Sequence, residues 1–198
     1  MTAGLSTGNA KHALADRGND LYETPPVAVH ALLQHDAVPD SIWEPACGPG
    51  SIVRVLRASG RRVFATDLVD YASPDQDRSG WDFLLERKLP EGIEAIVTNP
   101  PFKIGNEFVT KALSLCPCVY MLLRLAFIES ARRTAILDGG QLARVLVFSN
   151  RLPMMHRAGK GIASVDRQPS SAMAFAWFIW NREHMGPTEL KRIAWVAL

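Results

Sequence analysis

The residues best suited to chemistry are Asn99-Pro100-Pro101-Phe102. They follow an apolar run at 93–98 that predicts a buried strand. Because proline fixes φ and has no N–H to give to a sheet, the chain must leave the sheet there in a rigid loop. That loop could present two acceptors, the Asn99 amide oxygen and the Pro100 carbonyl, beside the Phe102 ring. Such an arrangement suits a planar exocyclic amino group, although Asn-Pro alone is typical of an ordinary turn that ends a strand.

A second motif, Glu44 to Gly50, lies between the first predicted strand of the sheet and the helix that follows it. Its glycines would let the backbone pass close to a ligand, and the helix N-terminus would favour a negative group such as a carboxylate. Asp67, at the end of the next predicted strand, could accept hydrogen bonds from both ribose hydroxyls. The third glycine of the dinucleotide pattern is missing, so the motif favours a nucleoside cofactor without phosphates.

The pair Asp82-Phe83 could complete such a pocket. Asp82 would accept a hydrogen bond from an adenine amino group, and Phe83 would pack on the ring. Taken singly, an acid is more often a surface residue and a phenylalanine more often a core residue. Their roles in a pocket therefore depend on the other motifs.

Alternating helices and strands must position these motifs. Thr24 is expected to cap a helix that begins at Pro25-Pro26 and runs to about His35. Further helices are expected from Ser51, near 106–115 and at 128–137, and strands at 41–44, 62–66, 93–98, 119–125, 144–148, 172–180 and 191–196. Alternation of this kind implies a mostly parallel sheet that is covered on both faces.

Composition places the chain among globular proteins. Its 198 residues are 47% hydrophobic, enough to bury the core of one domain. Residues 1–20, rich in small and polar types, predict a flexible N-terminal arm ahead of a single domain at 21–198. The longest apolar stretch, 116–128, contains Arg124 and is too short to span a bilayer. We therefore expect no membrane segment.

The cysteines argue against disulfides and against a metal. Cys47, Cys116 and Cys118 form neither an even set nor the paired spacing of a zinc site. We interpret Cys116 and Cys118 as core thiols. The expected setting is a reduced cytoplasm.

Charge divides the chain into two unequal halves. Residues 1–102 carry 9 Lys/Arg and 14 Asp/Glu, whereas residues 103–198 carry 13 and 6. A basic half is what a phosphate backbone would attract. A predicted loop at about 149–171 contains Arg151, His156, Arg157, Lys160 and Arg167 against one acid, Asp166. This loop is interpreted either as a nucleic-acid contact or as a solvated basic surface.

Three stretches together carry a family resemblance: Tyr22-Glu23-Thr24-Pro25, the segment Glu44 to Gly50, and Asn99 to Phe102. In this order they resemble the S-adenosylmethionine-dependent adenine-N6 DNA methyltransferases, particularly the small bacterial and phage-type enzymes. The resemblance implies an α/β, Rossmann-like class I methyltransferase fold. That fold has a doubly wound, mostly parallel seven-stranded sheet, with helices on both faces and an antiparallel strand near the C-terminus.

The resemblance also implies roles for residues. Asn99, Pro100, Pro101 and Phe102 would hold the target base. Separately, the charge of the predicted loop leads us to expect that Arg151, Arg157, Lys160 and Arg167 contact DNA phosphates. The residues that would bind S-adenosylmethionine are Tyr22, Thr24, Glu44, Ala46, Gly48, Gly50, Asp67, Asp82 and Phe83. These enzymes usually carry a sizeable target-recognition region, for which only about 149–171 is available here.

Other functions stay open on the sequence alone. RNA adenine methylation is hardly separated from DNA methylation. An Asn-Pro-Pro loop serves equally well to methylate a glutamine side-chain amide in a protein. A non-catalytic module that binds the cofactor or a nucleic acid is a further alternative, against which the intact motifs argue.

Overall fold

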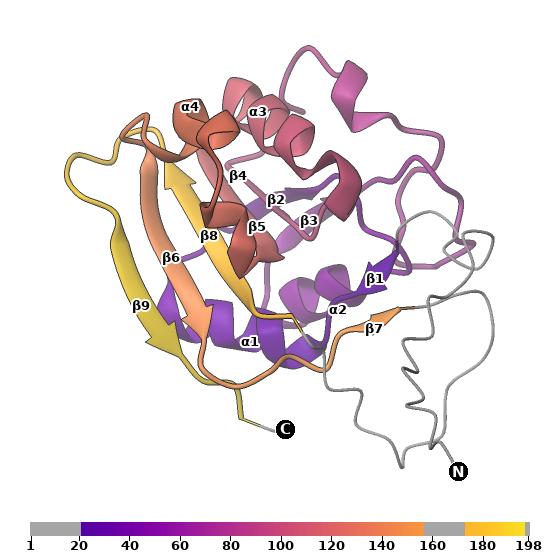
Figure 1. Ribbon diagram of the computed structural model, residues 1–198. Helices are drawn as coiled ribbons and strands as arrows, with labels where there is room; N and C mark the ends of the chain where they lie inside the picture. The colour runs from indigo at the N-terminus through magenta and orange to yellow at the C-terminus, as the bar shows by residue number, and fades with distance from the viewer. Residues whose placement is uncertain (1–20, 157–172, 197–198) are drawn as a thin grey trace, which may run out of the picture.

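A seven-stranded sheet forms the centre of the computed structural model, which describes residues 21–156 and 173–196 (Figure 1). β8 runs antiparallel to both its neighbours, and all other adjacent pairs are parallel. This is the sheet that the sequence predicted. In spatial order the strands are β3 (Arg62–Ala65), β2 (Ser41–Glu44), β4 (Ala95–Thr98), β5 (Cys118–Arg124), β8 (Phe175–Asn181), β6 (Leu142–Phe148) and β9 (Glu189–Ile193).

The central strands are buried because helices cover both faces of the sheet. All four residues of β2 and of β4 are buried. Trp177 and Trp180 of β8 are fully buried. Their indole N–H groups donate to the carbonyls of Ala28 (2.9 Å) and Ile136 (2.7 Å), which removes the cost of burying these donors.

Helices cover both faces of the main sheet (Figure 1). α1 (Pro26–His35) and α2 (Ser51–Ala58) lie on one side, and α3 (Gly105–Leu115) and the short α4 (Thr134–Leu137) lie on the other. The predicted cap of α1 is wrong. Pro25 occupies the N-cap position without a side-chain cap, and the Thr24 hydroxyl instead accepts a hydrogen bond from Asn99.

The helix expected at 128–137 is interrupted. The chain forms 3-10 turns at Leu125–Ile128 and Ala131–Arg133 before α4 begins. The Arg133 guanidinium donates to the carbonyls of Phe127 and Glu129 (both 2.9 Å), which satisfies these acceptors where the regular helix is absent. Ser130, at φ 144°, also breaks the helical path. The last strand, β9, lies at 189–193 and so begins and ends earlier than expected.

A second, two-stranded sheet joins β1 (Tyr22–Glu23) to β7 (Met155–His156), and the sequence did not predict it. Its strands are antiparallel, with Tyr22 opposite His156. β7 falls inside the predicted basic loop. The rest of that loop after 156, with Arg157, Lys160 and Arg167, and the predicted arm at 1–20 lie outside the described residues.

The topology identifies one edge of the main sheet as the place for a ligand. The chain passes from β2 outward to β3, then returns to add β4 on the other side of β2. Ligands of open α/β sheets bind outside the carboxyl ends of the strands at this reversal. Glu44, Asp67 and Asn99 all lie at or just after those ends. None of the helices in the described ranges is long and apolar enough to cross a membrane.

Candidate functional site

A cavity of about 570 Å³ lies at the carboxyl ends of β2, β3 and β4. Its size is that of a small-molecule site. Nine of the predicted site residues line it: Tyr22, Thr24, Ala46, Asp67, Asp82, Phe83, Asn99, Pro100 and Pro101. Four others, Glu44, Gly48, Gly50 and Phe102, do not line it and lie in the structure around it.

Asn99 leaves β4 with its side chain fixed in one orientation. Its Nδ2 donates to the Tyr22 carbonyl (2.9 Å) and to the Thr24 hydroxyl (3.0 Å). Because a carbonyl can only accept, the amide nitrogen must face Tyr22, and the amide oxygen must face away from it. Asn99 Oδ1 is buried and has no hydrogen-bond partner in the described part of the chain. A buried acceptor left unpaired is costly, so a ligand that brings a donor would gain here.

The prolines make this corner rigid and deprive it of N–H groups. No residue in the described ranges donates to the Pro100 carbonyl, whereas the Pro101 carbonyl accepts from Ile104 N (3.2 Å). The first part of the sequence prediction, a rigid corner with two acceptors, therefore matches the geometry. What the acceptors bind is a separate question.

Phe102 lies beside the corner, held from several sides. Its ring centroid is 4.5 Å from that of Tyr22 and 5.8 Å from that of Phe175. The Arg124 guanidinium carbon lies 4.3 Å from the same centroid. The ring is half-buried, so these contacts restrict its position without enclosing it.

Glu44 connects the ends of β2 and β4. Its side chain is buried, and Oε1 accepts from the Thr98 hydroxyl (2.6 Å) and from Ala46 N (3.3 Å). Burial raises the pKa of this carboxyl well above its ordinary value, against the opposing effect of the Thr98 hydrogen bond. Glu44 thus ties the turn at 45–50 (the glycine turn) to the strand bearing Asn99.

Asp67 has both carboxylate oxygens engaged by the backbone. Oδ2 accepts from Gly48 N and Oδ1 from Val69 N, each at 2.9 Å. Burial raises the pKa of this carboxyl, although the backbone hydrogen bonds favour its charged form. A carboxylate can accept about four hydrogen bonds. Asp67, which lines the cavity, therefore keeps capacity for ligand hydroxyls.

Asp82 and Phe83 form the far wall of the cavity. Asp82 Oδ1 accepts from Leu84 N (2.9 Å) and so caps the 3-10 helix Phe83–Leu85. The Phe83 ring packs against Trp43 and Phe108, with centroid distances of 5.1 and 4.8 Å. Phe83 is therefore a core residue as well as a wall residue.

The packing of the protein requires glycine at position 50. It has φ +92°, and a Cβ there would lie 2.3 Å from Asp75 Cβ. Asp75 belongs to the loop at 68–77, which follows β3 and lines the cavity with its first residues. The glycine thus admits a neighbouring loop where the sequence suggested room for a ligand.

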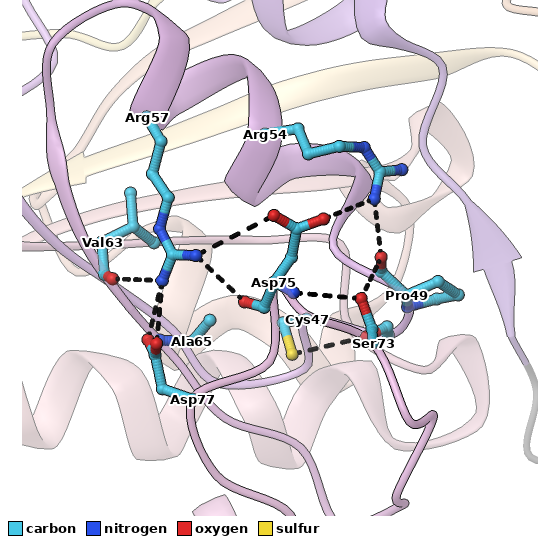
Figure 2. A network of polar contacts seen from close by, with 10 residues as sticks. Cys47, Pro49, Arg54, Arg57, Val63, Ala65, Ser73, Asp75 and Asp77 are labelled. Atoms are coloured by element: carbon cyan, nitrogen blue, oxygen red, sulfur yellow. Dashed lines mark hydrogen bonds and ion pairs between the residues drawn. The ribbon is translucent and has the colours of Figure 1, made fainter.

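An arginine network, Arg54 and Arg57 of α2 with Asp75 and Asp77, holds that loop in place (Figure 2). Arg54 and Asp75 are 2.8 Å apart, as are Arg57 and Asp77. Arg54 also donates to the Pro49 carbonyl (2.8 Å), so it joins the loop to the glycine turn. Sequence reasoning missed this network. The available signal was two arginines three positions apart on one helix face, followed by two acids two positions apart.

β1 is attached to the site at both of its residues. Asn99 binds the Tyr22 carbonyl, and Glu23 Oε1 accepts from the Ser51 hydroxyl at the start of α2 (2.7 Å). Arg54 lies 3.7 Å from the same Glu23 oxygen. A carboxylate of the chain itself therefore lies where the sequence predicted that α2 would favour a negative group.

The remaining candidates are less informative. Arg151 is exposed, and its carbonyl accepts from Trp195 Nε1 (3.2 Å). Cys116 is buried, as expected of a core thiol, and Cys118 is half-buried. Within 21–156 and 173–196, no three His, Cys, Asp or Glu side chains are grouped to hold a metal ion.

No protein-family model and no curated protein matches the sequence, but solved structures do. The "putative RNA methyltransferase PH1948" of Pyrococcus horikoshii aligns with a TM-score of 0.58 and 13% identity, over 86% of this chain and 90% of that one. The modification subunit of a "putative type I restriction enzyme" from Vibrio vulnificus YJ016 aligns with a TM-score of 0.59 and 14% identity, over 89% of this chain and 48% of that one. This chain therefore spans about half of that subunit.

A third neighbour is a "putative class I S-adenosylmethionine-dependent methyltransferase" from Listeria monocytogenes. It has a TM-score of 0.56 and 11% identity, over 86% of this chain and 63% of that one. At such identities the similarity concerns the fold. The chain has the Rossmann-like fold of class I S-adenosylmethionine-dependent methyltransferases, as the sequence predicted.

Proposed function

We propose that this chain transfers a methyl group from S-adenosylmethionine to the N6 amino group of adenine in DNA. The observation that carries the proposal is the orientation of Asn99. Both N–H groups of its amide are bound within the protein, and its buried oxygen has no partner among the described residues. An unpaired acceptor at the wall of a cavity calls for a donor such as an amino group.

The cavity residues fit the proposed cofactor. Asp67 would accept from the ribose hydroxyls with the lone pairs that Gly48 and Val69 leave available. Asp82 and Phe83 would hold the adenine ring, and Tyr22 with Thr24 would border the methionine end. Glu44, Ala46, Gly48 and Gly50 would shape the floor. When bound, S-adenosylmethionine supplies an electrophilic methyl group on a sulfonium.

The residues of the corner would then act on the substrate nitrogen. The lone pair of an adenine amino group is delocalised into the ring, which makes the nitrogen a poor nucleophile. Hydrogen bonds from this group to Asn99 Oδ1 and to the Pro100 carbonyl would favour a tetrahedral nitrogen with an available lone pair. Fixed dipoles at a rigid corner act without reorganisation in the transition state. The methylated nitrogen loses a proton readily, so the chain needs no strong base.

A base in duplex DNA must leave the stack to reach this corner. Phe102 is the proposed stacking residue, and Arg151, Arg157, Lys160 and Arg167 are the proposed phosphate contacts. Support comes from the basic second half of the chain and from the neighbours, which include the modification subunit of a restriction enzyme. Because another neighbour is described as an RNA methyltransferase, RNA is the second candidate substrate.

The test separates cofactor binding from substrate choice. Isothermal titration with S-adenosylmethionine should give one site per chain. Tritiated methyl transfer should then be measured on duplex DNA, on RNA and on a glutamine peptide, with digestion to nucleosides to identify the product. We expect N6-methyladenine from DNA.

Two outcomes would contradict the proposal. Label only in RNA or only in the peptide would change the substrate class and leave the chemistry intact. Cofactor binding without transfer to any of the three would instead indicate a non-catalytic module.

A further inference from the structure

We propose that the Tyr22 carbonyl and the Thr24 hydroxyl together orient the Asn99 amide for the reaction, which makes Thr24 a positioning residue. The inference rests on the proposed function for its kinetic consequence only. It assigns to the segment before α1 a task that differs from bordering the cofactor. That task is to determine which end of the Asn99 amide meets the substrate.

The orientation follows from donors and acceptors. An asparagine amide has one donor end and one acceptor end, and the two have nearly the same shape. The Tyr22 carbonyl has only lone pairs to offer, so it selects the donor end of Asn99. Thr24 takes the second N–H at 3.0 Å, which leaves Oδ1 as the group that a substrate would meet. Without the hydrogen bond to Thr24, rotation of the Asn99 amide about χ2 would be less restricted.

The surroundings make these two acceptors rigid. Thr24 is 3% exposed, and its expected task as a helix cap is performed by no side chain at all. Tyr22 is in β1, which pairs with β7, and the next residue, Glu23, is held by Ser51. The Thr24 hydroxyl is buried, does not cap α1, and is bound to the Asn99 amide, which lines the cavity. These contacts fit a role in orienting that amide.

Thr24→Val tests the assignment because valine keeps the shape of threonine and removes the acceptor. We expect kcat to fall about tenfold. Because valine keeps the shape with which Thr24 would border the cofactor, the Kd for S-adenosylmethionine and the KM for DNA should stay within about twofold of wild type. Thr24→Ser retains the hydroxyl, and its kcat should be close to that of the wild type. Thr110→Val, an exposed threonine-to-valine change on α3, is the matched control and should leave kcat unchanged.

A second readout does not depend on turnover. The side-chain NH₂ protons of Asn99 can be followed by ¹⁵N NMR, and Asn99→Asp identifies their signals by removing them. In the wild type both protons should exchange slowly with water, and in Thr24→Val one should exchange at least about tenfold faster. Thr24→Ser should again resemble the wild type.

These readouts separate the inference from the proposed function. Rapid exchange of both protons in the wild type would overturn the inference, whatever the substrate is. The same holds if Thr24→Val weakens cofactor binding and leaves kcat unchanged, because Thr24 would then contact the cofactor directly. Slow exchange that depends on Thr24, in a protein that methylates no nucleic acid, would instead contradict the proposed function and leave the orientation standing.

Discussion

The two walls of the cavity differ in how their polar groups are satisfied. The first wall, the turn at 45–50 with α2 and the segment 67–77, forms its hydrogen bonds and ion pairs internally. Asp67 accepts from two backbone N–H groups, and the arginine network fastens the loop (Figure 2). The second wall, the corner that begins at Asn99, leaves the oxygen of that amide without a partner in the described residues.

This difference indicates that the two walls have different roles. The first wall can keep its shape before any ligand arrives, because each constraint comes from another part of the chain. The corner is equally rigid in its backbone, but the buried oxygen is stabilised only when a donor reaches it. Changes in the first wall should therefore affect stability and cofactor affinity, and changes at the corner should affect turnover.

The largest effect is expected from Gly50→Ala. The new Cβ would be 2.3 Å from Asp75 Cβ, and φ +92° is unfavourable for alanine, so the free energy of unfolding should fall by roughly 3–5 kcal/mol. Denaturant unfolding measures this. Gly60→Ala is the matched control, because Gly60 has φ +88° and a Cβ there would meet no atom within 4 Å; it should lose only about 1 kcal/mol. Equal losses would mean that Asp75 does not restrict the turn.

The next largest effect is expected from Asn99→Ala. Loss of the acceptor should lower kcat by about 100-fold or more, by analogy with the removal of one fixed hydrogen-bonding group in other active sites. The Kd for S-adenosylmethionine, measured by titration, should stay within about threefold. If turnover on DNA were close to normal, the contrast between the two walls would lose its functional meaning.

Glu44, which connects the walls through Thr98, gives a pH-dependent effect. Because burial holds its pKa above the ordinary value of 4.5, the folded chain keeps a proton that the unfolded chain loses as the pH rises. The folded state then binds more protons, so Glu44 lowers stability progressively above about pH 4.5. The free energy of unfolding of Glu44→Gln, relative to wild type, should rise by at least about 1 kcal/mol between pH 5 and pH 8. Denaturant unfolding at the two pH values checks this, and a constant difference would mean that Glu44 is ionised in the fold.

The smallest effect is expected from Arg54→Met. The Arg54 side chain is 51% exposed, so its ion pair with Asp75 should contribute less than about 1 kcal/mol to folding. Because Arg54 also donates to the Pro49 carbonyl, we expect a rise of about threefold in the cofactor Kd with kcat unchanged. Arg62→Met, at the amino end of β3, serves as the control and should leave the Kd unaltered. A fall in kcat with an unchanged Kd would place Arg54 with the corner instead.

The parts of the fold that could be predicted are those set by local pattern. Apolar runs specify β4 and β5, and the Pro25-Pro26 pair marks the beginning of α1 because proline suits the first turn of a helix. The acceptor corner could likewise be predicted, since prolines restrict the backbone wherever the chain goes. The position of the glycine turn was predicted, but the close approach of Asp75 to Gly50 was not.

The parts that could not be predicted depend on contacts between distant residues. Thr24 has the sequence context of a cap, yet Asn99, 75 positions away, binds its hydroxyl. The segment expected to be a helix at 128–137 forms separate turns to which the Arg133 side chain donates, and no periodicity indicates such contacts. β1 and β7 have two residues each, too few to give an alternating pattern.

Because β1 pairs with β7, the length of the connection between β6 and β7 affects the position of Tyr22, whose carbonyl binds Asn99. Six residues, 149–154, join the end of β6 to β7, and β7 fixes the register of Tyr22. Deleting or adding one residue in that connection would shift the strand pair by one position and point alternate groups the other way. A change of length before Met155 should therefore displace Tyr22 and, through its carbonyl, the Asn99 amide.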